Sequence, residues 1–324
     1  LLSLVKIERI YFYLMAYPNM HCSKCHRKAV TFIRYNGMYL CKEHFVEFFE
    51  RRVKKEIRKQ GLPKGTIAVA LSGGKDSSVA CYMLWKILKD HKDRKLIAIT
   101  VDEGIKGYRD KTIEIARKLC NELGIEHYII SFKDEIGLTL DEISEIRGEL
   151  AECTYCGVFR RYCLNKLAKE KDAKVIALGH NLDDVSQTIL MNFIRNDLER
   201  MARMAPHKKI QPGYIPRIVP LRTVPEKEVT LYAYLKGFDV SEDECPYAIR
   251  AMRLLYREFL LQLEEKHPGS RHSILKSYLE LEECLREKFP PAKLQPCKIC
   301  NQPSSMPVCM ACQLKEKLRK SKKK

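Results

Sequence analysis

The chain of 324 residues is 45% hydrophobic and 31% charged, which is typical of a soluble globular protein with room for one large α/β domain and smaller modules. No apolar run reaches the about 20 residues that cross a bilayer, so we expect no membrane association. Because 59 Lys and Arg residues outnumber 41 Asp and Glu residues, the net charge of +18 favours a polyanionic partner such as RNA or DNA, although a solubilising surface would give the same excess.

The 14 cysteines do not indicate a secreted disulfide scaffold. Many of them stand in CxxC pairs, whose close spacing suits a metal better than a bridge between distant segments. The start of the chain also lacks the pattern of a cleavable secretory signal. We therefore expect a reducing, cytoplasmic location. Residues 1–19 begin with Leu and are set aside as a leader to which no function is assigned.

Residues 20–62 are predicted to form a zinc module followed by a basic helix. The pattern CxxC–x15–CxxH suits a tetrahedral zinc ion whose four ligands all come from the protein, here Cys22, Cys25, Cys41 and His44. His21 and His26 flank the first pair and are alternative fourth ligands. The helix expected over residues 45–61 carries an apolar stripe at every fourth position, namely Phe45, Phe49, Val53 and Ile57. Its Lys and Arg residues fit a solvated face or a nucleic-acid surface equally well.

Residues 63–240 alternate short β-rich runs with helical stretches. The runs TIAVAL, KLIAITV, HYIISF and KVIALG lack period-two polarity, as expected for buried parallel strands. Such alternation predicts the α/β class, with a doubly wound parallel sheet and helices on both faces. Residues 241–290 read as a helical segment.

A glycine-rich loop, SGGKDSS, follows the first of these strands and precedes a helix. Ser72, Gly73 and Gly74 let backbone N–H groups approach an anion at the helix N-terminus. Lys75 would neutralise phosphate charge. Two carboxylates are candidates for contacting Mg²⁺ or positioning the loop, Asp76 and Asp184. The spacing differs from a Walker loop and from a dinucleotide-binding loop, and SGGxDS resembles the pyrophosphate loop (PP-loop) of N-type ATP pyrophosphatases.

Three further cysteines form a separate constellation. Cys153 and Cys156 make a CxxC at the mouth of a predicted helix, and Cys245 follows almost ninety residues later. Three thiolates can anchor a 4Fe-4S cluster and leave one iron open, whereas two could act as a nucleophile and resolving pair that carries a persulfide. A CxxC with a coincidental third cysteine is the plain alternative. The remaining cysteines in helix-like runs are expected to be packed thiols: Cys81, Cys120, Cys163 and Cys284.

Residues 291–324 are predicted to form a zinc ribbon with a basic tail. The pattern CxxC–x8–CxxC again fills four tetrahedral positions, with Cys297, Cys300, Cys309 and Cys312. Both outer modules are expected to be structural. Nearby basic residues such as Lys24 and Lys298 leave open an added role in gripping RNA phosphates.

Six motifs follow one another between the two cysteine modules, in the order SGGKDS, VDEGIKGYRD, CTYCGVFRR, GHNLDD, KEVTLYAY and ECPYA. Together they resemble the cytosolic tRNA 2-thiolation proteins of archaea and eukaryotes. These proteins are related to the bacterial TtuA and TtcA sulfurtransferases. The resemblance spans residues 20–313. It implies that ATP adenylates the C2 oxygen of a tRNA uridine and that sulfur displaces AMP to give 2-thiouridine. It further implies ATP, Mg²⁺, a 4Fe-4S cluster and two Zn²⁺ as cofactors, and tRNA and a sulfur donor (free sulfide or a thiocarboxylated ubiquitin-like carrier) as partners. A homodimer is one assembly that the resemblance leaves open.

The resemblance also implies roles for individual residues. The cluster would be held by Cys153, Cys156 and Cys245, which with Arg160 and Asp184 make the predicted catalytic set. ATP would be bound by Ala70, Leu71, Ser72, Gly73, Gly74, Lys75, Asp76, Ser77, Val101, Gly179 and Asp184. The position of Arg160 is lysine in the enzymes that modify the T-loop uridine, so arginine here favours the wobble uridine. Because arginine does not readily lose its proton, Arg160 would clamp phosphate or a developing oxyanion rather than act as a base.

Three alternatives stay open on the sequence. One is the same chemistry at the T-loop uridine. Another is a different PP-loop enzyme, such as a tRNA lysidine synthetase or an amide-forming ligase, neither of which needs the three central cysteines. The third is a non-catalytic RNA-binding zinc protein. The intact glycine-rich loop argues against it, because such loops lower stability unless a ligand uses them.

Overall fold

The computed structural model describes residues 19–146, 150–207, 213–241, 243–250 and 253–321. Nearly all of the leader set aside above, and the last three lysines of the basic tail, lie outside these ranges. Within them, no helix is both long and apolar enough to cross a membrane.

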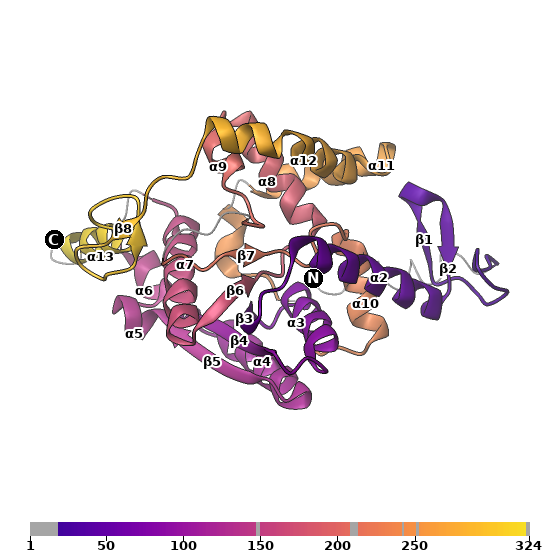
Figure 1. Ribbon diagram of the computed structural model, residues 1–324, viewed down its shortest axis with the longest axis horizontal. Coiled ribbons are helices and arrows are strands. Elements are labelled where there is room, and N and C mark those ends of the chain that lie inside the picture. The colour runs from indigo at the N-terminus through magenta and orange to yellow at the C-terminus, as the bar shows by residue number, and fades with distance from the viewer. Residues whose placement is uncertain (1–18, 147–149, 208–212, 242, 251–252, 322–324) are drawn as a thin grey trace.

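A five-stranded sheet forms the centre of the molecule (Figure 1). Its strands are β3 (Gly65–Ala70), β4 (Arg94–Asp102), β5 (Glu126–Ser131), β6 (Ala173–Ala177) and β7 (Arg217–Ile218). They lie in the order β5-β4-β3-β6-β7, and every neighbouring pair is parallel. The predicted doubly wound parallel sheet is therefore confirmed, and each of the four predicted strands lies within two residues of its expected range.

Helices cover both faces of this sheet. Along β3, Ile67 and Val69 pack into the core on one face, and Ala68 packs into the core on the other, as the alternation of a strand requires. The first face is covered by α2 (Lys42–Gln60), α3 (Lys75–Leu88), α4 (Arg109–Leu123) and α10 (Glu226–Leu235). The second is covered by α5 (Phe132–Ile136), α6 (Leu140–Glu145), α7 (Glu152–Glu170) and α13 (Met310–Ser321).

Helix α2 joins the N-terminal module to the sheet. Its predicted apolar stripe is confirmed, because Phe45, Phe49, Val53 and Ile57 are all buried against the first core. The helix ends at Gly61, whose φ of +81° lies in the region that favours glycine.

The C-terminal half adds a helical layer, and small modules lie at both ends. The layer contains α8 (Leu182–Ile194), α9 (Leu198–Ala202), the 3-10 helix η2 (Pro246–Arg250), α11 (Arg253–Lys266) and α12 (Ser270–Lys288). Leu275 and Tyr278 of α12 pack against Leu182 and Val185 of α8. The N-terminal module has η1 (Arg34–Asn36) between β1 (Thr31–Ile33) and β2 (Met38–Leu40), and the C-terminal module has β8 (Gln295–Pro296) and β9 (Pro303–Ser304). Figure 1 shows these modules at opposite ends of the molecule.

Candidate active site

The glycine-rich loop lies at the point where the sheet reverses its winding. From the central strand β3 the chain proceeds outward to β4 and β5, then returns to the other side of β3 as β6 and β7. Ligands of open parallel sheets bind beyond the carboxyl ends of the strands at such a point. Leu71 still donates its N–H to the carbonyl of Ile99 (2.9 Å), so the loop proper begins at Ser72. The segment after β6, which holds Gly179, faces it from the neighbouring strand.

Close backbone packing shapes this loop. The hydroxyl of Ser77 donates to the carbonyl of Gly74 (2.9 Å) and accepts the N–H of Ser72 (3.1 Å), which fixes the turn on the start of α3. Gly73 has a φ of +81°, and a Cβ there would lie 2.0 Å from the carbonyl oxygen of Thr112. A Cβ on Gly179 would lie 2.8 Å from the backbone N of Ser77. Both glycines are therefore required by contact with neighbouring backbone.

A half-buried charge cluster lies at the first turn of α3. The Nζ of Lys75 lies 2.9 Å from the Oδ2 of Asp76 and 2.8 Å from the Oε1 of Glu226. Burial opposes the charge of Lys75, but the two carboxylates outweigh it and raise its pKa. Burial raises the pKa of Asp76, although Lys75 and the amide of Asn181, which donates to Oδ1 (3.0 Å), favour its charged form. The loop thus holds a lysine that stays protonated, together with acidic oxygens of the kind that contact Mg²⁺.

Asp184 lies near this cluster as part of a helix cap. Its N–H donates to the side-chain oxygen of Asn181 (3.1 Å), and its Oδ2 accepts the N–H of Asn181 (3.1 Å), so the two residues form a reciprocal capping box at the start of α8. The other carboxylate oxygen lies 3.7 Å from Arg253. Because Asn181 also contacts Asp76, the cap links the segment after β6 to the phosphate loop.

The fold brings together the three central cysteines. Cys153 and Cys156 lie at the N-terminal end of α7, and Cys245 immediately precedes η2, where Cys153 approaches the carbonyl of Tyr247 at 3.6 Å. Burial raises the pKa of all three thiols, and each is raised further by another thiol of the set. Cys156 is buried, Cys245 is partly exposed and Cys153 is exposed.

A continuous series of polar contacts connects these thiols to the phosphate loop. Arg160 donates from Nη2 to the Sγ of Cys156 (3.0 Å), and its Nε lies 3.2 Å from one carboxylate oxygen of Glu103. The other oxygen of Glu103 lies 2.6 Å from the Nε of Arg109, which donates from Nη1 to the carbonyl of Ser72 (3.0 Å). Glu103 and Arg109 are buried, whereas 51% of the Arg160 side chain remains exposed. Arg160 can therefore contact both the thiol site and a bound substrate.

Sequence reasoning did not assign roles to Glu103, Arg109, Asn181 and Glu226. The first two stand in VDEGIKGYRD, which begins at the end of the strand β4. Their charges at the ligand-binding edge of the sheet could have identified them as candidates. Asn181 likewise follows β6 in GHNLDD. Nothing near Glu226 in the sequence predicts its contact with Lys75, because Glu226 begins α10, far along the chain from Lys75.

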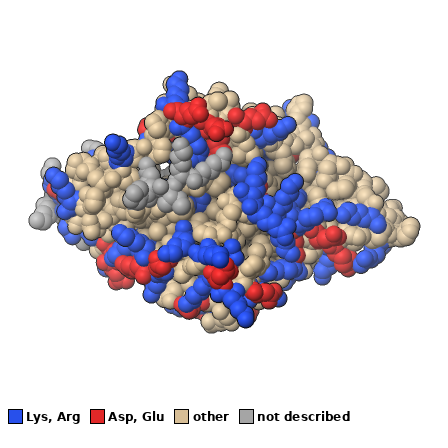
Figure 2. Space-filling model, in the orientation of Figure 1, with Lys and Arg blue, Asp and Glu red and all other residues tan. Residues whose placement is uncertain are grey.

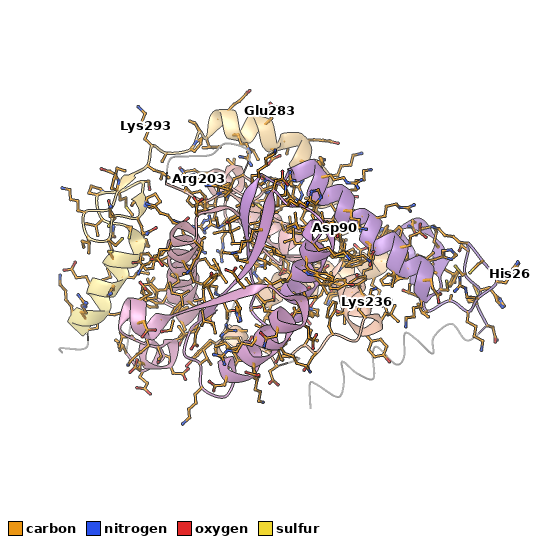
Figure 3. All side chains as sticks on the ribbon, turned by 60° about the horizontal axis from the view of Figure 1, so that its bottom comes forward. His26, Asp90, Arg203, Lys236, Glu283 and Lys293 are labelled. Atoms are coloured by element: carbon orange, nitrogen blue, oxygen red, sulfur yellow. The ribbon has the colours of Figure 1, made fainter. Side chains whose placement is uncertain are left out.

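The N-terminal cysteine module has the geometry of a closed zinc site. The ligand atoms of its four predicted residues all lie within 4.8 Å of one another. The Nδ1 of His44 is 3.3 Å from the Sγ of Cys22, and Cys25 and Cys41 have sulfur atoms 3.8 Å apart. Zinc–sulfur bonds of about 2.3 Å at tetrahedral angles place two sulfurs about 3.8 Å apart, so the fit is good. His26 is not part of this group, and Figure 3 shows it at the outer tip of the module.

The C-terminal module meets the same geometric test, with the ligand atoms of Cys297, Cys300, Cys309 and Cys312 all within 4.8 Å of one another. Cys300 and Cys309 have sulfur atoms 3.6 Å apart. The Sγ of Cys297 accepts the N–H groups of Ile299 (3.5 Å) and Cys309 (3.2 Å). Although burial acts against it, such backbone donors lower the pKa of Cys297 to about 6, which favours the thiolate that zinc binds.

The three central cysteines are arranged differently. In the described part of the chain, the ligand atoms of each outer module lie within 4.8 Å of one another, whereas those of the central set are not gathered that closely. Thiolates that each bind a different iron of a cluster stand farther apart than thiolates around one ion. Three soft donors, two of them reached by solvent, fit a cluster with one accessible iron.

Outside these sites, Cys81, Cys120 and Cys163 are buried packed thiols, as predicted. The prediction for Cys284 is wrong, because its position on α12 faces solvent.

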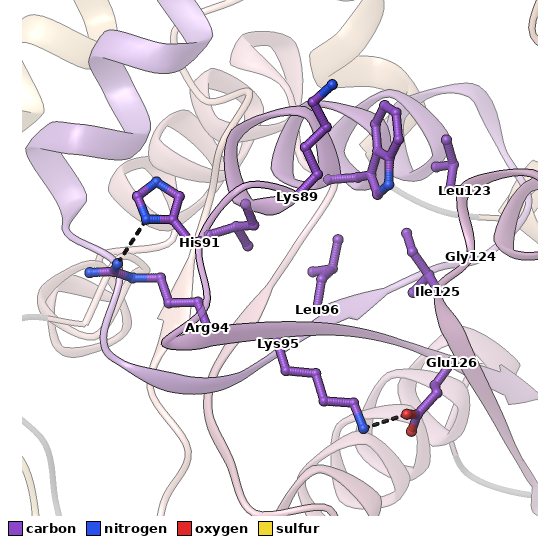
Figure 4. A pocket seen from close by; sticks show the side chains of 11 residues that line it. Lys89, His91, Arg94, Lys95, Leu96, Leu123, Gly124, Ile125 and Glu126 are labelled. Carbon is purple, nitrogen blue, oxygen red and sulfur yellow. Dashed lines mark hydrogen bonds and ion pairs between the residues drawn. The ribbon is translucent and has the colours of Figure 1, made fainter.

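A separate cavity of about 290 Å³ lies at the opposite edge of the sheet (Figure 4). It is bounded by the starts of β4 and β5 and the ends of α3 and α4, with Trp85, Arg94 and Glu126 among its lining residues. None of the predicted site residues lines it. In a parallel sheet this amino-terminal edge is not the usual ligand-binding edge.

Basic side chains gather on the surface near α2. Figure 2 shows Lys and Arg residues spread over the region where Figure 1 places this helix. Those of α2 that are exposed include Arg51, Lys55, Arg58 and Lys59. Such a surface suits a polyanion.

Comparison with known proteins identifies the domains. Residues 46–264 match the PP-loop domain family, and residues 14–46 match the N-terminal LIM domain of 2-thiouridine synthetase TtuA.

Curated relatives span nearly the whole chain. The tRNA 2-thiolation protein NcsA of Haloferax volcanii is 40% identical over 318 residues, covering 92% of this chain and 99% of the relative. The tRNA-5-methyluridine(54) 2-sulfurtransferase of Pyrococcus horikoshii is 36% identical over 295 residues, covering 90% and 93%. Cytoplasmic tRNA 2-thiolation protein 1 of Arabidopsis thaliana is 36% identical over 284 residues, covering 87% and 79%.

A solved structure resembles most of this chain. The U34-tRNA thiolase NcsA of Methanococcus maripaludis, determined with its 4Fe-4S cluster, superimposes with a TM-score of 0.79 at 36% identity. The match covers 93% of this chain and 97% of that one.

Proposed function

This chain belongs to the family of tRNA 2-thiolation proteins built on a PP-loop domain, and we propose that it is an ATP-dependent sulfurtransferase that converts a tRNA uridine to 2-thiouridine. The observation that carries this proposal is the unbroken path of contacts from the carbonyl of Ser72 through Arg109, Glu103 and Arg160 to the sulfur of Cys156. This path supports a reaction in which nucleotide activation and sulfur chemistry take place side by side. A lysidine synthetase or an amide-forming ligase would have no use for the three thiols.

The first half-reaction takes place at the phosphate loop. The C2 oxygen of the uridine attacks the α-phosphorus of ATP, and the bond to pyrophosphate breaks. Backbone N–H groups of the loop and the ammonium of Lys75 offset the phosphate charge, and Asp76 and Asp184 would hold Mg²⁺ when it is bound. The nucleotide-binding set proposed from the family lies at the carboxyl ends of β3, β4 and β6 and in the segments that follow them: Ala70, Leu71, Ser72, Gly73, Gly74, Lys75, Asp76, Ser77, Val101, Gly179 and Asp184.

The second half-reaction takes place beside the thiols. Sulfide adds to C2 of the activated uridine, and the C2–O bond then breaks, so that AMP leaves with the former carbonyl oxygen. A 4Fe-4S cluster on Cys153, Cys156 and Cys245, like that of the Methanococcus maripaludis relative, would supply an iron with an open position for sulfide. Arg160 remains protonated and stabilises negative charge that develops between C2 and the phosphate. Glu103 holds the guanidinium in place from the buried side.

We propose the wobble uridine as the target. Arg160 supports this assignment, as does the name of the Methanococcus maripaludis relative, a U34-tRNA thiolase. The Pyrococcus horikoshii relative is named for position 54, so the position within tRNA needs a direct test.

Two zinc ions, one in each outer module, complete the proposed metal content, supported by the ligand spacing described above. The proposed location is the cytoplasm, the compartment in the names of eukaryotic relatives. The identity of the sulfur donor and homodimerisation stay predictions, the latter testable by light scattering.

The reaction can be tested with protein purified without oxygen, unmodified tRNA, MgATP and sulfide. Nucleoside mass spectrometry should detect 2-thiouridine only when ATP is present, and nuclease mapping should place it at the wobble position. For substitutions of the central cysteines, the matched control is Cys284→Ala, which removes an exposed thiol and should behave as wild type. Pyrophosphate release without any 2-thiouridine would contradict the proposal, and thiolation confined to the T-loop would overturn the assigned position.

A further inference from the structure

Two arginines near the thiol site form no ion pair with a carboxylate in the part of the chain that the structure describes. Arg217 begins β7 and is 5% exposed, and its buried Nη1 makes no hydrogen bond within the described part of the chain. Arg161 follows Arg160 on α7, and its side chain is exposed. Among the described residues, no carboxylate contributes to the electrostatic environment of either guanidinium.

A buried cation of this kind is unusual, because removing a charge from water is unfavourable unless an opposite charge or hydrogen bonds compensate. Burial, together with the nearby Arg161, lowers the pKa of Arg217 to about 10, so the side chain is still charged at neutral pH. Its guanidinium lies 4.6 Å from the ring centre of Tyr214. The backbone N–H of Arg217 donates to the Nδ1 of His207 (3.1 Å), whose pKa is lowered to about 4 by burial and then by Arg217, so this ring is neutral.

The arginine pair lies next to the proposed reaction site. Arg217 pairs with Ile176 of β6, the strand that leads to the capping box of Asp184. Successive side chains on a helix point about 100° apart, so Arg161 extends from α7 in a different direction from Arg160. A Cβ on Gly157, the residue after Cys156, would lie 3.5 Å from the Nη1 of Arg161, so this guanidinium lies against the turn of α7 that holds the thiol. One turn further along α7, the Oδ1 of Asn165 accepts the N–H of Ile215, two residues before Arg217 (3.3 Å). An anion held between Arg161 and Arg217 would therefore lie near the group that reacts.

We propose that Arg161 and Arg217 form a binding site for a backbone phosphate of the RNA substrate, adjacent to the uridine that reacts. This inference rests on the proposed function. Guanidinium groups bind phosphate oxygens through paired hydrogen bonds, and backbone phosphate contacts set the register of a nucleic acid on a protein. The site would thereby present C2 of one uridine to the α-phosphate and the thiols.

The exposed arginine provides the first test, through Arg161→Gln. Lys169→Gln is the matched control, because Lys169 is an exposed basic residue on the same helix, about two turns away. Arg161→Gln should weaken tRNA binding about tenfold and reduce the slope of log Kd against log salt by about one, as expected for one lost phosphate contact. Its Kd for ATP should stay within about twofold of wild type, and Lys169→Gln should change tRNA binding less than about twofold.

Substitution of the buried arginine distinguishes a role in RNA binding from a role in the fold. Arg217→Met removes an uncompensated buried charge, so the free protein should have an equal or higher Tm while binding tRNA about tenfold more weakly. A large fall in Tm would show that Arg217 serves the fold and would overturn the site. Weakened ATP binding in either variant would assign the arginines to the nucleotide instead.

A synthetic anticodon stem-loop locates the phosphate. Replacing each phosphate flanking the target uridine by an uncharged methylphosphonate should weaken binding to wild type at one position, and at that position Arg161→Gln should cause no further loss. Additive losses at every position would overturn the assignment. If wild type forms no 2-thiouridine yet shows this coupling, the phosphate site stands and the proposed reaction falls.

Discussion

The outer cysteine modules and the central thiol site use the same side chain in two different geometries. In each outer module four ligand atoms lie within 4.8 Å of one another, and most of the cysteines are buried, so that a bound ion would have every position filled by protein. At the centre three cysteines converge among the described residues, Cys153 is exposed, and Arg160 contacts the sulfur of Cys156. The comparison teaches that ligand number and access, rather than residue type, separate a structural metal from a reactive one.

The two kinds of site also differ in what connects them to the rest of the protein. Each outer module takes its ligands from within about two dozen residues of chain, whereas the central site joins α7 to the segment before η2 and continues through Glu103 to the phosphate loop. Loss of a central ligand should therefore affect chemistry, and loss of an outer ligand should affect a local fold.

The largest expected effect is at the centre. Cys245→Ser should lower the rate of thiolation by more than about a thousandfold, because two thiolates cannot complete the three-ligand set, while the Kd for ATP changes less than about twofold. Iron and acid-labile sulfide in protein purified without oxygen should fall with the activity, and zinc should remain at two per chain. Full activity in an iron-free sample would remove the cluster and favour persulfide chemistry.

The path between loop and thiols is tested next, by Glu103→Gln. The substitution keeps the shape of the side chain but removes the charge that faces two arginines, so the thiolation kcat should fall about 30-fold, or about 2 kcal/mol in the barrier. Iron content should stay at the wild-type level, which separates lost positioning from lost ligation. Glu142→Gln, at an exposed ion pair with Lys133, is the matched control. Equal activity of the two variants would show that the path carries no function.

A smaller effect is expected for Arg160→Lys. An ammonium retains the positive charge but cannot contact Glu103 and Cys156 through separate nitrogens of a rigid plane, as the guanidinium does. We expect about a tenfold loss in kcat, with KM for ATP unchanged, and 2-thiouridine still at the wobble position. A shift of thiolation to the T-loop in position mapping would instead make this residue a determinant of the target.

The smallest effect on chemistry is expected for an outer module. Cys25→Ser should reduce zinc from two ions per chain to one, measured by elemental analysis, and lower the Tm of the N-terminal region. The thiolation rate at saturating tRNA should fall less than about threefold, since the module lies at the end of the molecule away from the sheet (Figure 1). A loss as large as that of Cys245→Ser would mean that the two kinds of site are not separable.

Much of this protein can be predicted from its sequence because the signals are local. The buried strands, the stripe of α2 and the phosphate loop each follow from residues close together in the chain, and a tetrahedral zinc ion limits how far apart its ligand pairs can stand. The convergence of Cys245 with the CxxC could be inferred only by resemblance, since no periodicity relates residues almost ninety positions apart.

Other features were decided by tertiary structure alone. Glu226 reaches Lys75 from α10, Glu103 bridges arginines on two helices, and Arg217 is buried near Arg161 with no carboxylate beside it in the described part of the chain. The sequence pattern around a charged residue does not predict its ion-pair partner, because the contacts depend on which strands are neighbours and on how the helices pack across them. The sequence by itself thus determined the sheet, the loop and the metal-binding modules, whereas the pairing of buried charges around the reaction site required the folded arrangement of the chain.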